Sequence, residues 1–246
     1  ERSSRDCPFR EFRCWEGTFP EEMPRNARCV EAGLAYHVTQ RGSNRQRVFF
    51  CATDYHMYLS LLREQIAPAG VRVLAYCLMT NHVHLVVVAE RVDSLAVLFR
   101  RVHGRYSQYL NTRRRRSGHL WQQRYFSCPL AGSHLGIAVR YVEQNPCRAH
   151  MVSAPADYRW SSARAHLGVA ADKTKLLDPE FWEQAGGIEA WRRMHLAADP
   201  PERVLLLRRC TYAGRPFGGE EFVERLEDRF QRHWRRWGFQ KPAART

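Results

Sequence analysis

Residues 71 to 89, VRVLAYCLMTNHVHLVVVA, decide the fold that we expect for this chain. Two runs of aliphatic and β-branched residues, Val71 to Leu78 and His82 to Ala89, flank the short polar connection Met79-Thr80-Asn81. This pattern predicts the two strands of an antiparallel hairpin. Because both runs are almost continuously apolar, we expect the two strands to lie in the centre of a sheet.

Further strands and helices are predicted on either side of the hairpin. In chain order they are a strand at 34–39, a helix at 54–70, the hairpin, a helix that starts at 93 and ends before 117, a strand at 120–130, and a helix from 133 to 146. The order β-α-β-β-α-β-α predicts an α+β, ferredoxin-like fold, in which a four-stranded antiparallel sheet carries two helices on one face. The last helix would then cover the other face, beside the strand that begins at His82.

The chain is divided here into three parts. Residues 1–22 show no sustained period and are interpreted as an N-terminal extension, and 23–168 as the main domain. Residues 169–246 predict short helices and form a C-terminal region that could add a DNA-binding surface.

The charge of the chain predicts a polyanionic partner. Lys and Arg number 39 against 25 Asp and Glu, a formal net charge of +14, and most of the excess is Arg, whose planar head group matches phosphate oxygens. A merely basic protein is the alternative. The run Arg113 to Arg116 and the pair Arg235-Arg236 concentrate the charge and favour nucleic acid.

The cysteines and the hydropathy argue against several classes of protein. The eight cysteines form no Cys-x-x-Cys pair, which argues against a zinc finger or a disulfide scaffold. No apolar run approaches the roughly 20 residues of a membrane span, and the charged N-terminal stretch does not resemble a signal peptide. We therefore expect a cytoplasmic protein without membrane contact.

His82 and His84 are the first candidate metal ligands. Side chains at positions i and i+2 of a strand point to the same face, so the two imidazoles would lie side by side while Val83 enters the core. Neutral imidazoles bind divalent metals, and two of them leave coordination positions open. On its own the motif is a weak signal, because structural or exposed histidines are common.

Tyr141 and Asn145 are a second candidate pair. They stand four residues apart on the last predicted helix, so a phenol and an amide oxygen would share one helix face. The alternative is a buried tyrosine followed by a helix-ending Asn-Pro.

Four ordered sequence blocks together resemble the HUH single-tyrosine transposases, and specifically the REP-associated tyrosine transposases. The resemblance extends from Met23-Pro24-Arg25 to about Gly168. The blocks are YHVTQRG at 36–42, MTNHVHL at 79–85, WQQRY at 121–125 and RYVEQNP at 140–146.

The resemblance implies a role for each member of the two candidate pairs. His82 and His84 would be the metal ligands, Tyr141 the nucleophile, and Asn145 would occupy the place where related enzymes put a polar third ligand, often Gln. The implied activity is cleavage and rejoining of single-stranded DNA at or near hairpin, REP-like sequences, through a 5′-phosphotyrosine intermediate, in DNA transposition. Mg²⁺ or Mn²⁺ would be the cofactor, the partner would be single-stranded or hairpin DNA rather than a small molecule, and the protein would be a monomer or a homodimer.

Basic and aromatic residues near these blocks are predicted to contact the DNA. The expected phosphate contacts are Arg41, Asn44, Arg45 and Arg47 after the first strand, Arg100, Arg101 and Arg105 on the polar face of a helix, and Arg124 and Arg148. Trp121 and Tyr125 are expected to stack on unpaired bases, with core packing as the alternative for Trp121. Arg148, together with Arg140, is also a candidate to favour the phenolate of Tyr141.

Three other functions fit parts of the sequence. The main alternative is a domesticated protein that binds hairpin DNA or RNA without cutting it. A replication initiator or relaxase would share the metal and tyrosine chemistry, but the chain contains no helicase-like segment. A zinc-structured regulator is disfavoured because the cysteines are not clustered.

Overall fold

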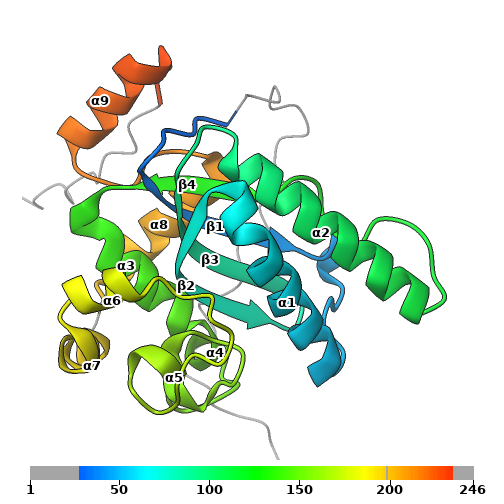
Figure 1. Ribbon diagram of the computed structural model, residues 1–246. Helices are drawn as coiled ribbons and strands as arrows, with labels where there is room; N and C mark the ends of the chain where they lie inside the picture. The colour runs from blue at the N-terminus through cyan, green and yellow to red at the C-terminus, as the bar shows by residue number, and fades with distance from the viewer. Residues whose placement is uncertain (1–27, 198, 235–246) are drawn as a thin grey trace, which may run out of the picture.

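The computed structural model describes residues 28–197 and 199–234. The expected N-terminal extension at 1–22, the start of the family resemblance at Met23-Pro24-Arg25, and the pair Arg235-Arg236 lie outside these residues. Four strands form one antiparallel sheet in the order β2-β3-β1-β4 (Figure 1). They are β1 (Ala35–Arg41), β2 (Val71–Met79), β3 (His82–Ala89) and β4 (Phe126–Leu130). This is the predicted split β-α-β topology, and the predicted fold class is confirmed.

Helices α1 (Ala52–Ala69) and α2 (Ser94–Arg113) cover one face of the sheet. α1 begins at Ala52, two residues before the predicted Asp54. Asp54 is the third residue of the helix, and its side chain caps the N-terminus. Its Oδ2 accepts hydrogen bonds from the backbone N–H groups of Phe50 (2.8 Å) and Cys51 (3.2 Å). The helix ends at Gly70, whose φ of 61° is left-handed.

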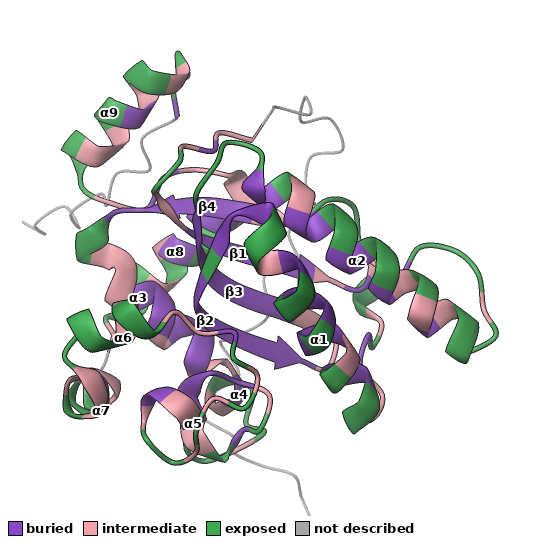
Figure 2. Cartoon of the chain, in the orientation of Figure 1, coloured by how far each residue is buried: buried purple, intermediate pink, exposed green. Residues whose placement is uncertain are grey.

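The other face of the sheet carries the helices that follow β4. They are α3 (Gly132–Glu143), α4 (Asn145–Arg148), α5 (Ala163–His166), α6 (Pro179–Gln184), α7 (Gly187–Leu196) and α8 (Pro201–Ala213), while α9 (Glu220–Phe230) lies at the end of the described chain. The strands are buried on both faces, and α1, α2 and α3 each turn a buried stripe toward the sheet (Figure 2). There are accordingly two hydrophobic cores, one on each side of the sheet.

The C-terminal region contributes directly to the second core. Leu207 and Cys210 of α8 and Phe217 pack with Val86 and Val88 of β3. Leu130 also forms a parallel bridge to Phe217. The described residues beyond 169 contain short helices, as predicted, and they complete the hydrophobic packing of the sheet.

Two predicted boundaries are corrected. β4 begins at Phe126 rather than at Leu120, because Gln123 adopts a left-handed φ of 49° that interrupts the extended chain. Trp121 keeps only an isolated bridge to Gly42. α3 ends at Glu143, before the predicted Pro146, which lies instead in the first turn of the short α4, where its missing N–H is tolerated.

None of the helices in the described ranges is long and apolar enough to cross a membrane.

Candidate active site

His82 and His84 lie on the sheet face that carries α3 and α8. Their alternation along β3 sends Val83 into the core beneath α1 and α2, as predicted. The two imidazole centroids are 4.9 Å apart. In the antiparallel register Arg41 of β1 lies opposite His82, and Thr39 lies opposite His84.

Helix α3 places Tyr141 against His84 and against His37 of β1. The phenol ring centroid is 5.7 Å from that of His84, with the two planes at 90°. Tyr141 is 6% exposed, and burial raises the pKa of its phenol, against the attraction of the cations Arg148 and Arg208. The site thus holds a neutral phenol beside two imidazoles.

Arg148 is the cation nearest to Tyr141. Its guanidinium lies 4.3 Å from the ring centroid, and its Nη2 donates to the Tyr141 carbonyl. Arg140, the other cation expected here, pairs instead with Asp199. Only one of the two predicted arginines therefore acts on the phenol.

Asn145 begins α4, one turn after Tyr141. Its Nδ2 lies 3.4 Å from the Tyr141 carbonyl, and its Oδ1 accepts no hydrogen bond from the described residues. The amide oxygen therefore has capacity for a further partner.

The hydrogen bonds of Asn81 determine which nitrogen of His82 carries the hydrogen. Asn81 Nδ2 donates to the Arg45 carbonyl at 3.2 Å, which turns its Oδ1 toward His82 Nδ1 at 2.6 Å. Because an amide oxygen only accepts, His82 Nδ1 must donate, and Nε2 keeps a free lone pair.

The two histidines suit a divalent cation. Burial lowers the pKa of His82 to about 3, with a further contribution from Arg41, and it lowers the pKa of His84 well below its ordinary value. Both imidazoles are therefore neutral near pH 7, the form that binds metals. Within the described residues, no three His, Cys, Asp or Glu side chains are grouped to hold a metal. A cation bound by these two imidazoles would keep open coordination positions.

The loop after β1 lies beside the start of β3. The backbone N–H groups of Gly42 and Val48 donate to the carbonyls of Asn81 and Thr80, at 2.8 Å and 2.9 Å. Three predicted DNA contacts are exposed on this loop, namely Asn44, Arg45 and Arg47. The fold therefore brings these side chains and Arg41 to the histidine end of the sheet.

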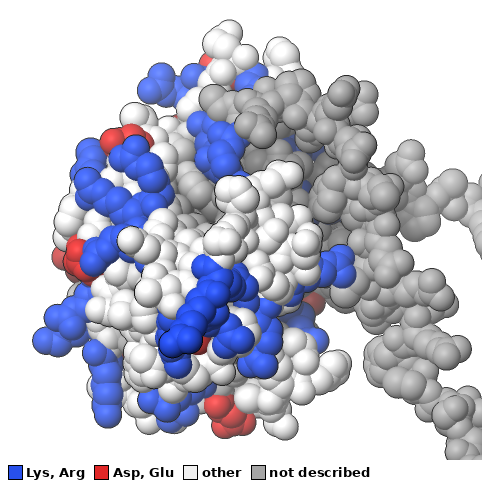
Figure 3. Space-filling view, turned by 90° about the vertical axis from the view of Figure 1, so that its right-hand side faces the viewer, with Lys and Arg blue, Asp and Glu red and all other residues white. Residues whose placement is uncertain are grey.

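Arg100, Arg101 and Arg105 lie elsewhere. They are exposed on α2, on the opposite side of the sheet from His82. Arg105 pairs with Glu64, and Arg101 donates to Gln65 at 3.3 Å. Figure 3 shows the side of the molecule that lies on the right in Figure 1, where Lys and Arg side chains are prominent and Asp and Glu side chains are few. The exposed arginines of α2 themselves lie across the sheet from the histidine site.

Trp121 and Tyr125 belong to the core beneath α2. Trp121 Nε1 donates to the His103 carbonyl at 3.3 Å, and the two ring centroids are 4.6 Å apart. The Tyr125 ring lies between Phe99 and the guanidinium of Arg28, at 4.7 Å and 3.6 Å. Because both rings are engaged within the protein, we do not propose them as base contacts. Arg124 between them is exposed.

His37 and two residues of α8 also reach the site, and none of them was among the predicted site residues. His37 Nε2 lies 3.0 Å from His84 Nδ1, and His37 Nδ1 lies 2.8 Å from Thr211 Oγ1. The hydroxyl of Tyr212 accepts from Arg41 Nη2 at 3.4 Å. The alternation of His37, Thr39 and Arg41 on β1 could have indicated a polar stripe facing the histidines.

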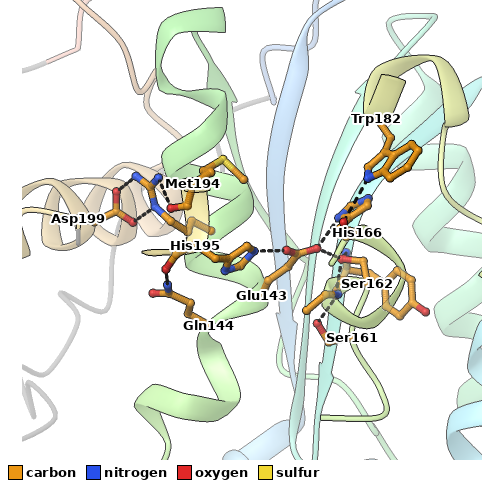
Figure 4. Close-up of polar contacts among 12 residues, drawn as sticks. Glu143, Gln144, Ser161, Ser162, His166, Trp182, Met194, His195 and Asp199 are labelled. Carbon is orange, nitrogen blue, oxygen red and sulfur yellow. Dashed lines mark hydrogen bonds and ion pairs between the residues drawn. The ribbon is translucent and has the colours of Figure 1, made fainter. Parts of the chain in front are cut away.

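A second polar cluster surrounds the buried carboxylate of Glu143, two residues after Tyr141. Glu143 Oε1 contacts His166 Nδ1 at 2.6 Å and Oε2 contacts His195 Nε2 at 2.7 Å, while Ser162 donates to Oε1 (Figure 4). Burial would raise the pKa of Glu143, but the attraction and hydrogen bonds of the two histidines outweigh it and bring it to about 2. The cluster ties α5 and α7 to the helix that carries the tyrosine.

Glu143 predicts an acid-sensitive part of the stability. Its pKa is about 2 in the folded protein against an ordinary 4.5, so the contribution is complete above about pH 4.5 and is lost as the pH falls toward 2. A shift of this size corresponds to about 3 kcal/mol. We expect Glu143→Gln to lower the free energy of unfolding by about 2 to 3 kcal/mol at pH 7 and to flatten its decline in acid, as measured by urea unfolding across a pH series. The control Glu90→Gln removes an exposed carboxylate, and parallel acid declines in the parent and Glu143→Gln would contradict the assignment.

Comparison with known proteins identifies a similar family. Residues 31–145 match the family model of IS200-like transposases. The matched segment contains the whole sheet, His82, His84 and Tyr141. This segment is similar to IS200-like transposases, in agreement with the resemblance inferred from the sequence blocks, and the similarity supports transposase-type DNA processing.

A solved structure supports the fold. The structure of a REP-associated tyrosine transposase bound to a REP hairpin is similar with a TM-score of 0.53 and 18% identity, over 68% of this chain and 93% of that one. A putative transposase from Deinococcus radiodurans R1 gives a TM-score of 0.35 and 17% identity, over 49% of this chain and 97% of that one. No curated protein sequence matches the chain.

Proposed function

We propose that this protein is a metal-dependent nuclease and strand transferase that cuts and rejoins single-stranded DNA at or near hairpin, REP-like sequences. The observation that carries the proposal is the contact of Tyr141 with His84, which lies beside His82 on one sheet face, within the segment that matches IS200-like transposases. The REP hairpin bound by the similar transposase supports the choice of DNA. The direct test is whether DNA labelled on the 3′ side of the cut becomes covalently attached to the protein.

The proposed chemistry is a transesterification at Tyr141. The phenol oxygen attacks phosphorus, the Tyr–O–P bond forms as the P–O3′ bond breaks, and the phenol proton ends on the leaving 3′ hydroxyl. The product is a 5′-phosphotyrosine and a free 3′ end. Because the link retains a phosphodiester, a 3′ hydroxyl can reverse the step and rejoin the strand.

A divalent cation bound by His82, His84 and Asn145 would stabilise negative charge on the phosphate oxygens. Mn²⁺ accepts imidazole more readily than Mg²⁺, which prefers oxygen, so we expect both to support activity and Mn²⁺ to bind more tightly. Arg148, over the Tyr141 ring, favours the phenolate, whose formation burial opposes.

The loop after β1 is proposed to guide the DNA strand. Its exposed Arg45 and Arg47 lie beside the turn that leads into His82, and Arg41 lies opposite His82 in the sheet. Phosphate contacts by these side chains would orient the strand without reading its sequence. Arg124 and the basic surface of α2 remain proposed as additional contacts.

Binding of hairpin DNA with a single-stranded flank should weaken steeply with salt. Each lost phosphate contact lowers the slope of log affinity against log salt by about 0.7 to 0.9, so Arg45→Ala should reduce both the affinity and this slope. Fluorescence anisotropy at a series of salt concentrations measures both. Arg100→Ala, on the opposite side of the sheet, is the matched comparison. If only Arg100→Ala lowered the slope, the DNA path would run over α2 instead of the loop.

A further inference from the structure

We propose that Thr211 and His37 determine which nitrogen of His84 is free to bind a cation, so that helix α8 is a working part of the metal site. The inference rests on the proposed function and deepens it. It assigns a positioning role to Thr211, which lies beyond the residues matched by the family model.

The direction of three consecutive hydrogen bonds follows from the hydroxyl of Thr211. This group has one hydrogen, and Thr211 donates it to the Leu207 carbonyl at 2.8 Å. Toward His37 the hydroxyl can then only accept, so His37 Nδ1, at 2.8 Å, must carry a hydrogen. A neutral imidazole has one N–H, which leaves His37 Nε2 as an acceptor.

The last of these three hydrogen bonds determines which nitrogen of His84 carries the hydrogen. Its Nδ1 lies 3.0 Å from the accepting His37 Nε2 and therefore donates. The two ring planes differ by only 7°. The hydrogen of neutral His84 is thus held on Nδ1, and Nε2 keeps its lone pair. Nε2 makes no hydrogen bond to any residue in the described part of the chain.

Burial makes this direction hard to replace by solvent. His37 is 1% exposed, His84 4% and Thr211 1%. In such surroundings each polar group depends on its protein partner, because water does not substitute for it. If these hydrogen bonds ran in the opposite direction, the hydrogen would lie on His84 Nε2, where it would block a cation.

His82 reaches the same state through different partners. Asn81 holds the hydrogen of His82 on Nδ1, so that its Nε2 is also the free nitrogen. Two independent hydrogen-bond arrangements therefore prepare the same nitrogen on both candidate ligands. Structural packing of the rings alone would not require this agreement. A partner that orients the second nitrogen is the usual companion of a metal-bound histidine.

Thr211→Val is the central test, because valine keeps the shape of threonine and removes the hydroxyl. Thr211→Ser keeps the hydroxyl. Thr211→Ala removes the hydroxyl without putting a methyl group in its place. Thr39→Val is the matched control: Thr39 is also a buried threonine on this face, but its hydroxyl donates to the Val83 carbonyl at 2.9 Å and takes no part in the chain.

The first readout is the tautomer of His84 in the metal-free protein, from ¹⁵N–¹H correlation spectra of the imidazoles. We expect hydrogen on Nδ1 in the parent, Thr39→Val and Thr211→Ser proteins, and a mixed or reversed tautomer in Thr211→Val and Thr211→Ala. The second readout is Mn²⁺ affinity by electron paramagnetic resonance titration. It should fall about 10-fold or more in Thr211→Val and recover in Thr211→Ser.

The outcomes separate this inference from the proposed function. If the parent binds Mn²⁺, His82→Ala weakens that binding, and both Thr211→Val and Thr211→Ala keep the parent tautomer and affinity, the role of Thr211 is overturned and the metal site stands. If the parent and His82→Ala proteins bind Mn²⁺ equally weakly, the metal site itself fails, and the inference fails with it. Equal losses in Thr39→Val and Thr211→Val would reduce the effect to general packing and would also overturn the proposal.

Discussion

Tyr141→Phe should abolish the covalent protein–DNA adduct while hairpin binding stays within about twofold of the parent value. The substitution removes one oxygen and preserves the ring that packs against His84 and Arg148. The Tyr141 hydroxyl makes no hydrogen bond to a described residue, so its loss should leave folding intact. Without the nucleophile we expect at least about a 1,000-fold loss of cleavage, corresponding to about 4 kcal/mol.

The measurement is a denaturing gel of DNA labelled on the 3′ side of the cut, on which 5′-phosphotyrosine formation moves the label to the mass of the protein. Tyr212→Phe is the matched control, because its phenol also lies near the site, within hydrogen-bond distance of Arg41. Label retained by Tyr141→Phe and lost by Tyr212→Phe would transfer the nucleophilic role to Tyr212. A parent protein that binds hairpins tightly but never carries label on any tested strand would instead be the non-cleaving binder considered above.

His82→Ala should stop cleavage by a different route. Removing one of the two imidazoles leaves a cation only His84 and the amide of Asn145, so we expect about a 100-fold lower rate at a Mn²⁺ concentration that saturates the parent. Excess Mn²⁺ should restore part of the rate, because the defect is one of occupancy.

The metal response distinguishes the two variants. Excess Mn²⁺ should leave Tyr141→Phe inactive, since no concentration of cation replaces the lost phenol. His56→Ala, which removes an exposed histidine on α1, serves as the control and should follow the parent curve. A parent-like rate in His82→Ala at every Mn²⁺ concentration would contradict the assignment of His82 as a ligand.

The local patterns of the sequence predicted the fold and the centre of the site. Period-two alternation set the face of His82 and His84, and the order of elements set the sheet topology, because both depend on neighbouring residues. The contact of His37 with Thr211 joins positions 174 residues apart, and no local pattern reports such a separation. Trp121 shows a different limit. A residue in an extended segment has two faces available to it, so alternation alone could not assign Trp121 to the core.

The α2 arginines show a second limit of sequence reasoning. Their helical spacing correctly predicted an exposed basic face. The spacing does not say which side of the sheet that helix covers, and the fold places it opposite the histidines. Proximity to the site depends on the packing of whole layers, which the amphipathic pattern of one helix leaves open.

The second hydrophobic core crosses the limit of the family segment. Val86, Ile137 and Tyr141 lie inside that segment, whereas Leu207 and Phe217 lie beyond it, and all five share one packed interior. Exchanging the C-terminal regions of two related transposases would therefore replace part of an interior as well as a surface. The unit that recombination or protein engineering can exchange intact is larger than the family segment, because a foreign tail must also match the shape of this interior.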